Sequence, residues 1–305
     1  MCEEYQLVKH CYELTPAYVV EGPKTCPSTQ ELFFTLQYQG AGEKHKILRQ
    51  CRPITNFAKT QCQGTLDPHM KSNKGQAFEF QHTGDFKFII TSDGAFECHV
   101  RLQHMVPGTK WTGPSAFACR VNGVDIFTWD QGSFRVNGHP VTVTATSQYN
   151  LPEGGFIKLE SSGKRIRVVS PNRAELFFDL AGTYTNGNDK IQSANFYGLI
   201  PSDLGVSGLC AGGDSKTIAH WLNDRAYGLF PFTYEAKVLG SAFPVPTFTA
   251  EETKNAEALC TPIFDPKFRK LEFDNCVDDV LNTNFVNRDA TLQAEKDAAL
   301  NTPNK

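Results

Sequence analysis

Short apolar runs separated by turn signals recur between residues 63 and 235. Alternation of apolar and polar residues in runs of this length is typical of β-strands. Several runs lead into Asn-Gly or Asp-Gly pairs, which supply the positive φ angles that tight hairpin turns require. The pattern predicts antiparallel strands in a β-sandwich or a barrel. The runs and their turns are 86–90 with Asp93-Gly94, 116–121 with Asn122-Gly123, 134–136 with Asn137-Gly138, and 157–160 with Ser162-Gly163.

A helical pattern replaces the strands after residue 248. Thr249 and Glu252 have the spacing of a capping box, which predicts a short helix that ends near Cys260. Farther along, apolar residues recur at the spacing of one helix face. We expect residues 236–305 to form a linker and a short α-helical, cysteine-bearing tail. The apolar face consists of Phe273, Cys276, Val277, Val280 and Leu281.

Composition and charge exclude several classes of protein. Hydrophobic residues make up 40% of the 305 residues and charged residues 21%, as in a globular chain. The formal net charge of −3 gives no electrostatic attraction to nucleic acid or to an anionic membrane. No apolar run approaches the roughly 20 residues of a membrane helix. The basic stretch 44–49 is either a solvated face or a contact for a polyanion.

The ten cysteines are the most informative part of the composition. None of them forms a Cys-x-x-Cys pair, which excludes the usual zinc-ribbon, ferredoxin and thioredoxin motifs. Five disulfides or ten buried thiols remain, and the crowding of cysteines within residues 1–62 favours disulfides. We expect residues 1–62 to form a small cysteine-rich module. The ten are Cys2, Cys11, Cys26, Cys51, Cys62, Cys98, Cys119, Cys210, Cys260 and Cys276.

The first residues of the sequence do not have the pattern of a secretory signal peptide. Met1 to Tyr5 have neither the basic start nor the apolar stretch of a signal peptide. We therefore interpret the sequence as a mature or truncated piece of a longer, secreted or cell-surface precursor, whose signal peptide is absent from this chain.

The stretch Gly64-Thr65-Leu66-Asp67-Pro68-His69-Met70 resembles the opening of a von Willebrand factor type D (VWD) domain. Further elements follow in the order of that family, and Gly208-Leu209-Cys210 is similar to its closing Gly-Leu-Cys element. The resemblance covers about 63–235, which we expect to be a VWD-like β-domain. The other similar elements are 78–81, 84–86, 96–101, 116–124, 134–138, 151–155, Trp221 and 229–234.

This resemblance implies an extracellular, disulfide-bonded, β-sandwich-like module. Such modules serve assembly, adhesion and scaffolding and are rarely enzymes. The sequence also lacks the hydrolase, phosphate-loop and zinc-protease motifs. We therefore expect a non-enzymatic structural or adhesive module. Its partners would be other extracellular proteins, glycans or copies of itself, and not nucleic acid.

Many VWD domains bind calcium, but most ligands that the resemblance implies are missing here. Where the family has an acidic residue after the histidine, this chain has Asn73-Lys74-Gly75, and a lysine would repel the ion. In the loop after Cys210, only Asp214 matches a family ligand. We expect the calcium site to be weakened or lost, and no other cofactor. Other oxygen sources, which we expect to form turns, are Asp203, Asn186, Asn188 and Asp189.

Some VWD-family members cleave themselves between the Asp and Pro of the opening motif, which gives a first alternative function. The Asp67 carboxyl could attack its own carbonyl carbon to form a cyclic anhydride. The Pro68 nitrogen would leave with a proton from His69. The family glycine is Leu66 here, which removes backbone freedom. Asp67-Pro68 is otherwise only a turn, and Asp265-Pro266, which lacks the histidine, is an internal control.

A carbohydrate-binding module is the second alternative. Trp111, Trp129 and Trp221, together with 23 phenylalanines, could supply a platform of exposed rings. Core packing is the more common role of such residues. The loop from His104 to Pro114 combines Pro, Gly, Lys110 and Trp111, and it is the best candidate for an exposed contact loop.

The resemblance and the expected strands suggest disulfide pairs. Cys62 precedes the opening motif and Cys210 closes the domain, so this pair would clip its two ends. Cys98 and Cys119 lie on neighbouring expected strands, and Cys260–Cys276 would join the tail helices. Three arrangements of Cys2, Cys11, Cys26 and Cys51 stay open. The family's Cys-x-x-Cys is Ser207-Gly208-Leu209-Cys210 here, so disulfide exchange through that motif is not expected.

Overall fold

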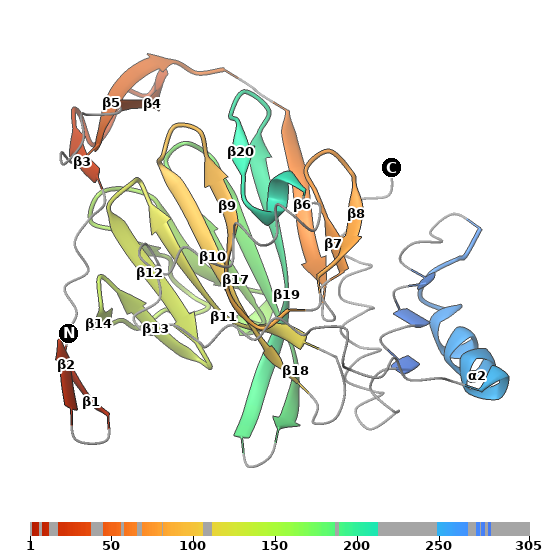
Figure 1. The fold of residues 1–305 in the computed structure, drawn as a ribbon. Helices are drawn as coiled ribbons and strands as arrows, with labels where there is room; N and C mark the ends of the chain where they lie inside the picture. The colour runs from red at the N-terminus through yellow and green to blue at the C-terminus, as the bar shows by residue number, and fades with distance from the viewer. Residues whose placement is uncertain are drawn as a thin grey trace.

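The structure is a computed structural model of the 305-residue chain. It describes residues 2–5, 8–11, 18–37, 45–55, 58–65, 69–80, 82–105, 112–186, 189–212, 249–267, 273–274, 276–277 and 280–281. Antiparallel strands dominate these residues, which confirms the mainly β fold expected from the sequence (Figure 1).

A seven-stranded antiparallel sheet forms one layer of the fold (Figure 1). Its five central strands follow one another along the chain as hairpins, and a short strand from the end of the domain pairs with β9 at one edge. The order across the sheet is β14 (His139–Pro140), β13 (Ser133–Val136), β12 (Asp125–Asp130), β11 (Thr112–Val121), β10 (Phe96–His104), β9 (Gly84–Thr91) and β20 (Val206–Ser207).

An eight-stranded antiparallel sheet forms the other layer. Its strand β6 comes from before the seven-stranded sheet in the chain and pairs with β19 from after it, so the sandwich begins at Lys59. The order is β15 (Tyr149–Asn150), β16 (Phe156–Glu160), β17 (Arg165–Val169), β18 (Glu175–Asn186), β19 (Asp189–Pro201), β6 (Lys59–Thr65), β7 (His69–Lys71) and β8 (Ala77–Glu79).

Aromatic side chains from both sheets meet between the layers and form the core. Phe88 on β9 packs edge-on against Phe196 on β19, with ring centroids 4.6 Å apart. Phe117 on β11 and Trp129 on β12 lie 4.4 Å and 5.2 Å from Phe178 on β18. Burial of such large rings is a major part of the hydrophobic stabilisation of a domain. This shared core makes the fold a β-sandwich.

The Asn-Gly pairs form the hairpin turns that the sequence predicts. Asn122 and Gly123 have φ angles of 54° and 80°, and Asn137 and Gly138 have φ angles of 49° and 81°. These turns join β11 to β12 and β13 to β14. The tight turns therefore set the antiparallel register of the seven-stranded sheet.

Residues before the sandwich form two small sheets. The N-terminal sheet consists of β3 (Tyr18–Glu21), β5 (His45–Pro53) and β4 (Gln30–Gln37), with β3 parallel and β4 antiparallel to β5. A separate hairpin of β1 (Cys2–Tyr5) and β2 (Val8–Cys11) places Cys2 opposite Cys11. Figure 1 shows the N-terminal sheet above the loops at one end of the sandwich.

The tail begins with α2 (Ala250–Cys260), which has the predicted capping box. The Thr249 hydroxyl accepts a hydrogen bond from the Glu252 backbone, and the Glu252 carboxylate accepts one from the Thr249 backbone. The tail has a small buried cluster of its own, made of Ala256, Cys260, Phe264, Cys276, Val280 and Leu281. Among the described residues, no helix is long and apolar enough to cross a membrane.

Candidate functional site

The opening motif lies on the hairpin of β6 and β7, which pairs Thr65 with His69 and Gly64 with Met70. A Cβ on Gly64 would lie 2.4 Å from a Phe196 ring carbon, so only glycine fits against the core here. His69 is buried. The other motif residues, Leu66, Asp67 and Pro68, lie outside the described residues. The structure therefore brings together the residues on either side of the candidate cleavage bond, but it does not describe the bond itself.

The turn after β7 meets the closing Gly-Leu-Cys element. The backbone N–H of Asn73 donates a hydrogen bond of 2.8 Å to the Cys210 carbonyl oxygen. The Ser72 hydroxyl holds the turn by accepting from the backbone N–H groups of Lys74 and Gln76. The Cys62–Cys210 disulfide also joins β6 to the Gly-Leu-Cys element. The two ends of the domain are thus joined by a covalent bond and a hydrogen bond within a few residues of each other.

The oxygen atoms at this junction decide whether it can hold calcium. The amide oxygen of Asn73 is buried without a hydrogen-bond partner, so it is one oxygen that a cation could use. Calcium binds six to eight oxygens, chiefly of carboxylates. No group of three His, Cys, Asp or Glu that could hold a metal occurs among the described residues, and Lys74 is exposed on the same turn. The described residues at this junction therefore do not fit calcium.

The remaining oxygen donors considered in the sequence lie elsewhere or are not described. Asp214 and Asn188 lie outside the described residues. Asp203 forms an ion pair of 3.1 Å with Arg52 of the N-terminal sheet. Asn186 is the last residue of β18 and is paired with Asp189, the first residue of β19.

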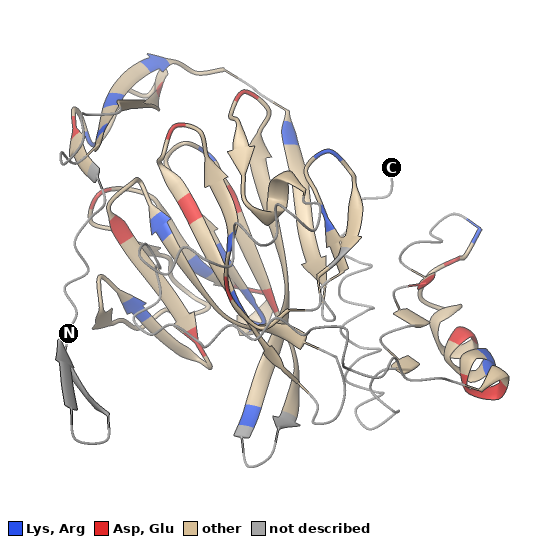
Figure 2. Cartoon of the chain, viewed as in Figure 1, with Lys and Arg blue, Asp and Glu red and all other residues tan. Residues whose placement is uncertain are grey.

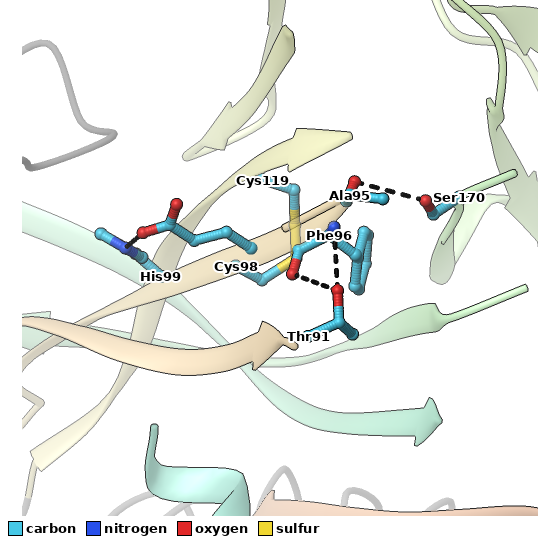
Figure 3. Close-up of a disulfide and its surroundings, with 8 residues drawn as sticks. Thr91, Ala95, Phe96, Cys98, His99, Cys119 and Ser170 are labelled. Atoms are coloured by element: carbon cyan, nitrogen blue, oxygen red, sulfur yellow. Dashed lines mark hydrogen bonds and ion pairs between the residues drawn. A yellow bond between two sulfur atoms is a disulfide. The ribbon is translucent and has the colours of Figure 1, made fainter. Parts of the chain in front are cut away.

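Four disulfides connect described cysteines, and none of the described cysteines is free. Three of them are the pairs considered above: Cys62–Cys210, Cys98–Cys119 and Cys260–Cys276. The Cys98–Cys119 bridge joins opposite residues of β10 and β11 in the core (Figure 3). The fourth, Cys26–Cys51, selects one of the three open arrangements and leaves Cys2 opposite Cys11.

A buried charge cluster lies on the face of β10 that points away from the core disulfide. Glu97 accepts a hydrogen bond of 2.5 Å from Arg120, and its other oxygen lies 2.8 Å from Nε2 of His99. Burial alone would raise the pKa of Glu97. The His99 hydrogen bond and the charges of His99, Arg120 and Lys87 outweigh burial and lower the pKa to about 2. Both oxygens of Glu97 thus have a partner within the sheet.

A second buried acid ties one sheet to the other. Asp93, in the turn between β9 and β10, accepts hydrogen bonds from Thr91, from the Ala95 backbone and from the Asn172 amide of the β17–β18 turn. The Ser170 hydroxyl also reaches the Ala95 carbonyl (Figure 3). Burial raises the pKa of Asp93 in spite of these hydrogen bonds. Asp93 therefore holds two turns of opposite sheets together at one end of the sandwich.

The N-terminal sheet docks on that same end of the sandwich through apolar contacts. Phe34 and Ile47 of the N-terminal sheet form one buried cluster with Ala95 of the sandwich. A Cβ atom added to Gly94 would lie 3.3 Å from the Ile47 side chain, and one added to Gly123 would lie 2.4 Å from it. The turns that contain Gly94 and Gly123 therefore have glycines where the Ile47 side chain packs against them.

Ion pairs surround this apolar contact. Glu153, in the loop between β15 and β16, binds both Lys24 at 2.5 Å and Arg49 at 3.1 Å. The Lys24 hydrogen bond, with support from Arg49, lowers the pKa of Glu153 although burial opposes it. Glu31 of the N-terminal sheet binds Arg173 of the sandwich at 3.2 Å. Figure 2 shows that both signs of charge occur on the N-terminal sheet and on both layers of the sandwich.

Two cations of the basic stretch 44–49 form ion pairs within the chain. Arg49 is buried, with Glu153 and the Gly22 carbonyl as its partners, and is not part of a solvated face. Lys46 pairs with Glu21 of β3 at 2.8 Å. Lys44 lies outside the described residues. The sequence showed these cations but not the distant acids that bind them.

The aromatic residues of the carbohydrate alternative fall in different places. Trp129 is completely buried between the sheets, so it cannot be an exposed platform. Trp111 and Trp221 lie outside the described residues, as does most of the loop 104–114. On the outer face of the eight-stranded sheet, Phe177 and Tyr197 stack at 4.6 Å, and Arg165 lies over both rings. The arginine covers the ring faces that a sugar would need.

Compared with known proteins, the chain matches no family model and no curated protein sequence.

Proposed function

We propose that this chain is a non-enzymatic extracellular module that resembles a VWD domain and serves assembly or adhesion by holding neighbouring segments in place. The Cys62–Cys210 disulfide is the observation that carries the proposal. It joins the strand before the Asp-Pro-His motif to the Gly-Leu-Cys element 148 residues later, as the resemblance implies. A cross-link that closes so long a loop stabilises a domain by restricting its unfolded state.

Other features support a rigid scaffold in an oxidising compartment. Disulfides persist mainly in secreted and surface proteins, and four connect the described cysteines. Glu97 and Asp93 are buried and fully engaged by partners inside the sandwich. Docking of the N-terminal sheet on the sandwich by apolar contacts and ion pairs fixes one neighbouring segment directly.

Binding by the secreted, purified chain tests this function. The chain would be immobilised and exposed to purified extracellular-matrix proteins, to soluble copies of itself, to a glycan array and to a panel of ester, peptide and glycoside substrates. We expect saturable binding to a matrix protein or to the chain itself. Binding to glycans alone would favour the carbohydrate alternative, and turnover of a substrate would overturn the non-enzymatic proposal.

Calcium is not part of the proposed function. Because the described junction at Asn73 offers no carboxylate, we expect the thermal unfolding midpoint in calcium to match that in a chelator within about 1 °C. A higher midpoint with millimolar calcium would show that residues such as Asp214 complete a site.

Cleavage between Asp67 and Pro68 is a second candidate function, favoured by the position of β6. This strand is held by pairing with β19 and β7 and by the Cys62–Cys210 disulfide. The two products, 1–67 and 68–305, would therefore stay together after the bond breaks. Attack of the Asp67 carboxylate on its own carbonyl carbon would expel the Pro68 nitrogen, which takes up a proton, and water would open the anhydride.

Incubation at mildly acidic pH followed by gel electrophoresis tests the cleavage. We expect two fragments only on a reducing gel, because the disulfide keeps them joined on a non-reducing gel. Asp67→Ala should abolish them. An intact chain, or equal loss at the control bond Asp265-Pro266, would end this candidate.

A further inference from the structure

The four described disulfides differ in their access to solvent. Three of them are completely buried at both cysteines: Cys62–Cys210, Cys98–Cys119 and Cys260–Cys276. Cys26 and Cys51 are both partly exposed. The residues on either side of Cys26, from Pro23 to Thr25 and from Pro27 to Thr29, are exposed as well. Thiol–disulfide exchange requires a thiolate to reach a sulfur atom, so access decides which disulfide reacts in the folded protein.

The partly exposed Cys26–Cys51 disulfide lies in the connection that contacts the sandwich. Cys26 lies in the connection from β3 to β4, and Cys51 lies on β5, so the bridge ties this connection to the central strand of the N-terminal sheet. The same connection carries Lys24, which binds Glu153 of the sandwich. It also carries the Gly22 carbonyl, which accepts a hydrogen bond of 3.1 Å from Arg49. Freeing the connection from β5 removes one covalent constraint on both contacts, which leaves them held by the pairing of β3 with β5.

We propose that Cys26–Cys51 is a thiol-exchange site, at which a low-molecular-weight thiol opens the disulfide in the folded protein and loosens the N-terminal sheet from the sandwich. The disulfides inside the sandwich stay closed, because their sulfur atoms are buried. The inference follows from the exposure of the disulfides and does not rest on the VWD-like function.

The exchange proceeds in two balanced steps. A small-molecule thiolate bonds to one sulfur of the bridge, the Cys26–Cys51 bond breaks, and the other cysteine leaves as a thiolate that takes up a proton. A second small thiol attacks the mixed disulfide and releases the remaining cysteine. The bridge gains two electrons, and two small thiols are oxidised to one disulfide.

Differential alkylation tests which disulfide exchanges. The full, folded chain is treated with increasing reduced glutathione, quenched with iodoacetamide and analysed by peptide mass spectrometry. We expect Cys26 and Cys51 to be modified by glutathione or alkylated at least about tenfold faster than the six buried cysteines. Equal rates at Cys98 and Cys119, or no reaction at Cys26 and Cys51 before global unfolding, would overturn the proposal.

Hydrogen exchange tests the loosening. After partial reduction, we expect amides of β3 and β4 to exchange about tenfold faster, with no change in β10 and β11. The double variant Cys26→Ser/Cys51→Ser should show the same faster exchange before any thiol is added and no further response to glutathione. Unchanged exchange in β3 and β4 after complete reduction of Cys26–Cys51 would show that the disulfide does not control docking.

Discussion

At the scale of single residues, two buried carboxylates show opposite shifts of their pKa. Burial raises the pKa of Asp93, whose partners are neutral hydroxyl, amide and backbone groups. Burial also opposes ionisation of Glu97, but the His99 hydrogen bond and nearby cations outweigh it and lower the pKa to about 2. The difference lies in the charge of the partners, since a guanidinium stabilises a buried carboxylate far more than an amide does.

Replacement of Glu97 by glutamine should destabilise the sandwich strongly. The change leaves the buried Arg120 guanidinium without its carboxylate, which costs about 3 kcal/mol in the free energy of unfolding. In the native protein, the folded-state pKa of about 2 lies below the unperturbed 4.5. The Glu97 contribution is therefore fully present above pH 4.5 and is lost as the pH falls toward 2. Urea unfolding at pH 7 and pH 3 measures both effects.

Glu160→Gln is the matched control for that experiment. Glu160 forms longer ion pairs, of 3.4 Å with Arg167 and 3.7 Å with Lys158, at the partly exposed face of the other sheet. Such a pair contributes less than about 1 kcal/mol. Similar losses for both variants would contradict the assignment of Glu97 as a buried anchor.

The sequence predicted the strand that carries Glu97 but not the role of this residue. Alternation places Glu97 and His99 on the face opposite Cys98, which packs in the core. Alternation indicates which face a residue occupies, but not whether that face is covered. Both residues are buried, and the Arg120 partner comes from the neighbouring strand in a register that only the folded sheet sets.

At the scale of the elements, the closing Gly-Leu-Cys element packs directly against the backbone of β9. Gly208 has a φ of 89°, and a Cβ on it would lie 2.7 Å from the Phe88 carbonyl oxygen and 2.8 Å from that of Lys87. Backbone atoms of a central strand cannot move aside as the end of a flexible side chain can. The glycine is therefore required by close approach as well as by its left-handed conformation.

Gly208→Ala should lower the free energy of unfolding by at least about 3 kcal/mol. Gly75→Ala is a suitable control, since Gly75 has a similar φ of 82° but no atom within 4 Å of its Cβ position. Gly75→Ala should lower the free energy of unfolding by only roughly 1 kcal/mol, the cost of an alanine in the left-handed conformation. Thermal unfolding of both variants separates the steric clash at position 208 from the backbone strain that the two positions share. Equal losses of stability would show that the alanine Cβ does not clash with β9.

Local signals explain which elements could be predicted. Asn-Gly turns and the Thr249–Glu252 capping box depend on neighbouring residues, and the structure has both as expected. Pairing of β6 with β19 joins segments more than 120 residues apart, as in Cys62 opposite Gly198. Nothing in either segment alone specifies that pairing. The strand order of the eight-stranded sheet could therefore not be predicted from the pattern of apolar and polar residues.

At the scale of the whole molecule, docking of the N-terminal sheet depends on Glu153. Glu153→Gln removes the ion pairs with Lys24 and Arg49 and should weaken docking by about 1–2 kcal/mol. The pKa of Glu153 is lower in the folded protein than in the unfolded chain. The contribution of Glu153 to docking is therefore fully present above the usual glutamate pKa, and it is lost as the pH falls through the folded-state pKa. Hydrogen exchange at pH 7 should become faster in β4 and β5 and stay unchanged in β10.

Glu21→Gln is the control for docking. Its partner Lys46 lies within the N-terminal sheet, and both side chains are exposed. This variant should leave exchange in β4 nearly unchanged. Equal effects of the two variants would mean that Glu153 has no special role in docking.

Docking could not be read from the sequence, although the residues that make it were visible there. The Arg49–Glu153 contact spans 104 residues, and each partner looks like an ordinary surface charge in its own segment. Only the fold brings the loop between β15 and β16 to the N-terminal sheet. The same reason explains why Cys26–Cys51, the one partly exposed bridge among the described disulfides, could not be distinguished from the sequence.

Intact mass with and without reduction tests the central claim, an extracellular disulfide-bonded module, most directly. The secreted chain is measured under denaturing conditions before and after treatment with a strong reductant. Four described disulfides, together with Cys2 opposite Cys11, predict a gain of ten hydrogen atoms, one for each of the 10 cysteines. An unchanged mass would show ten free thiols and would contradict the account.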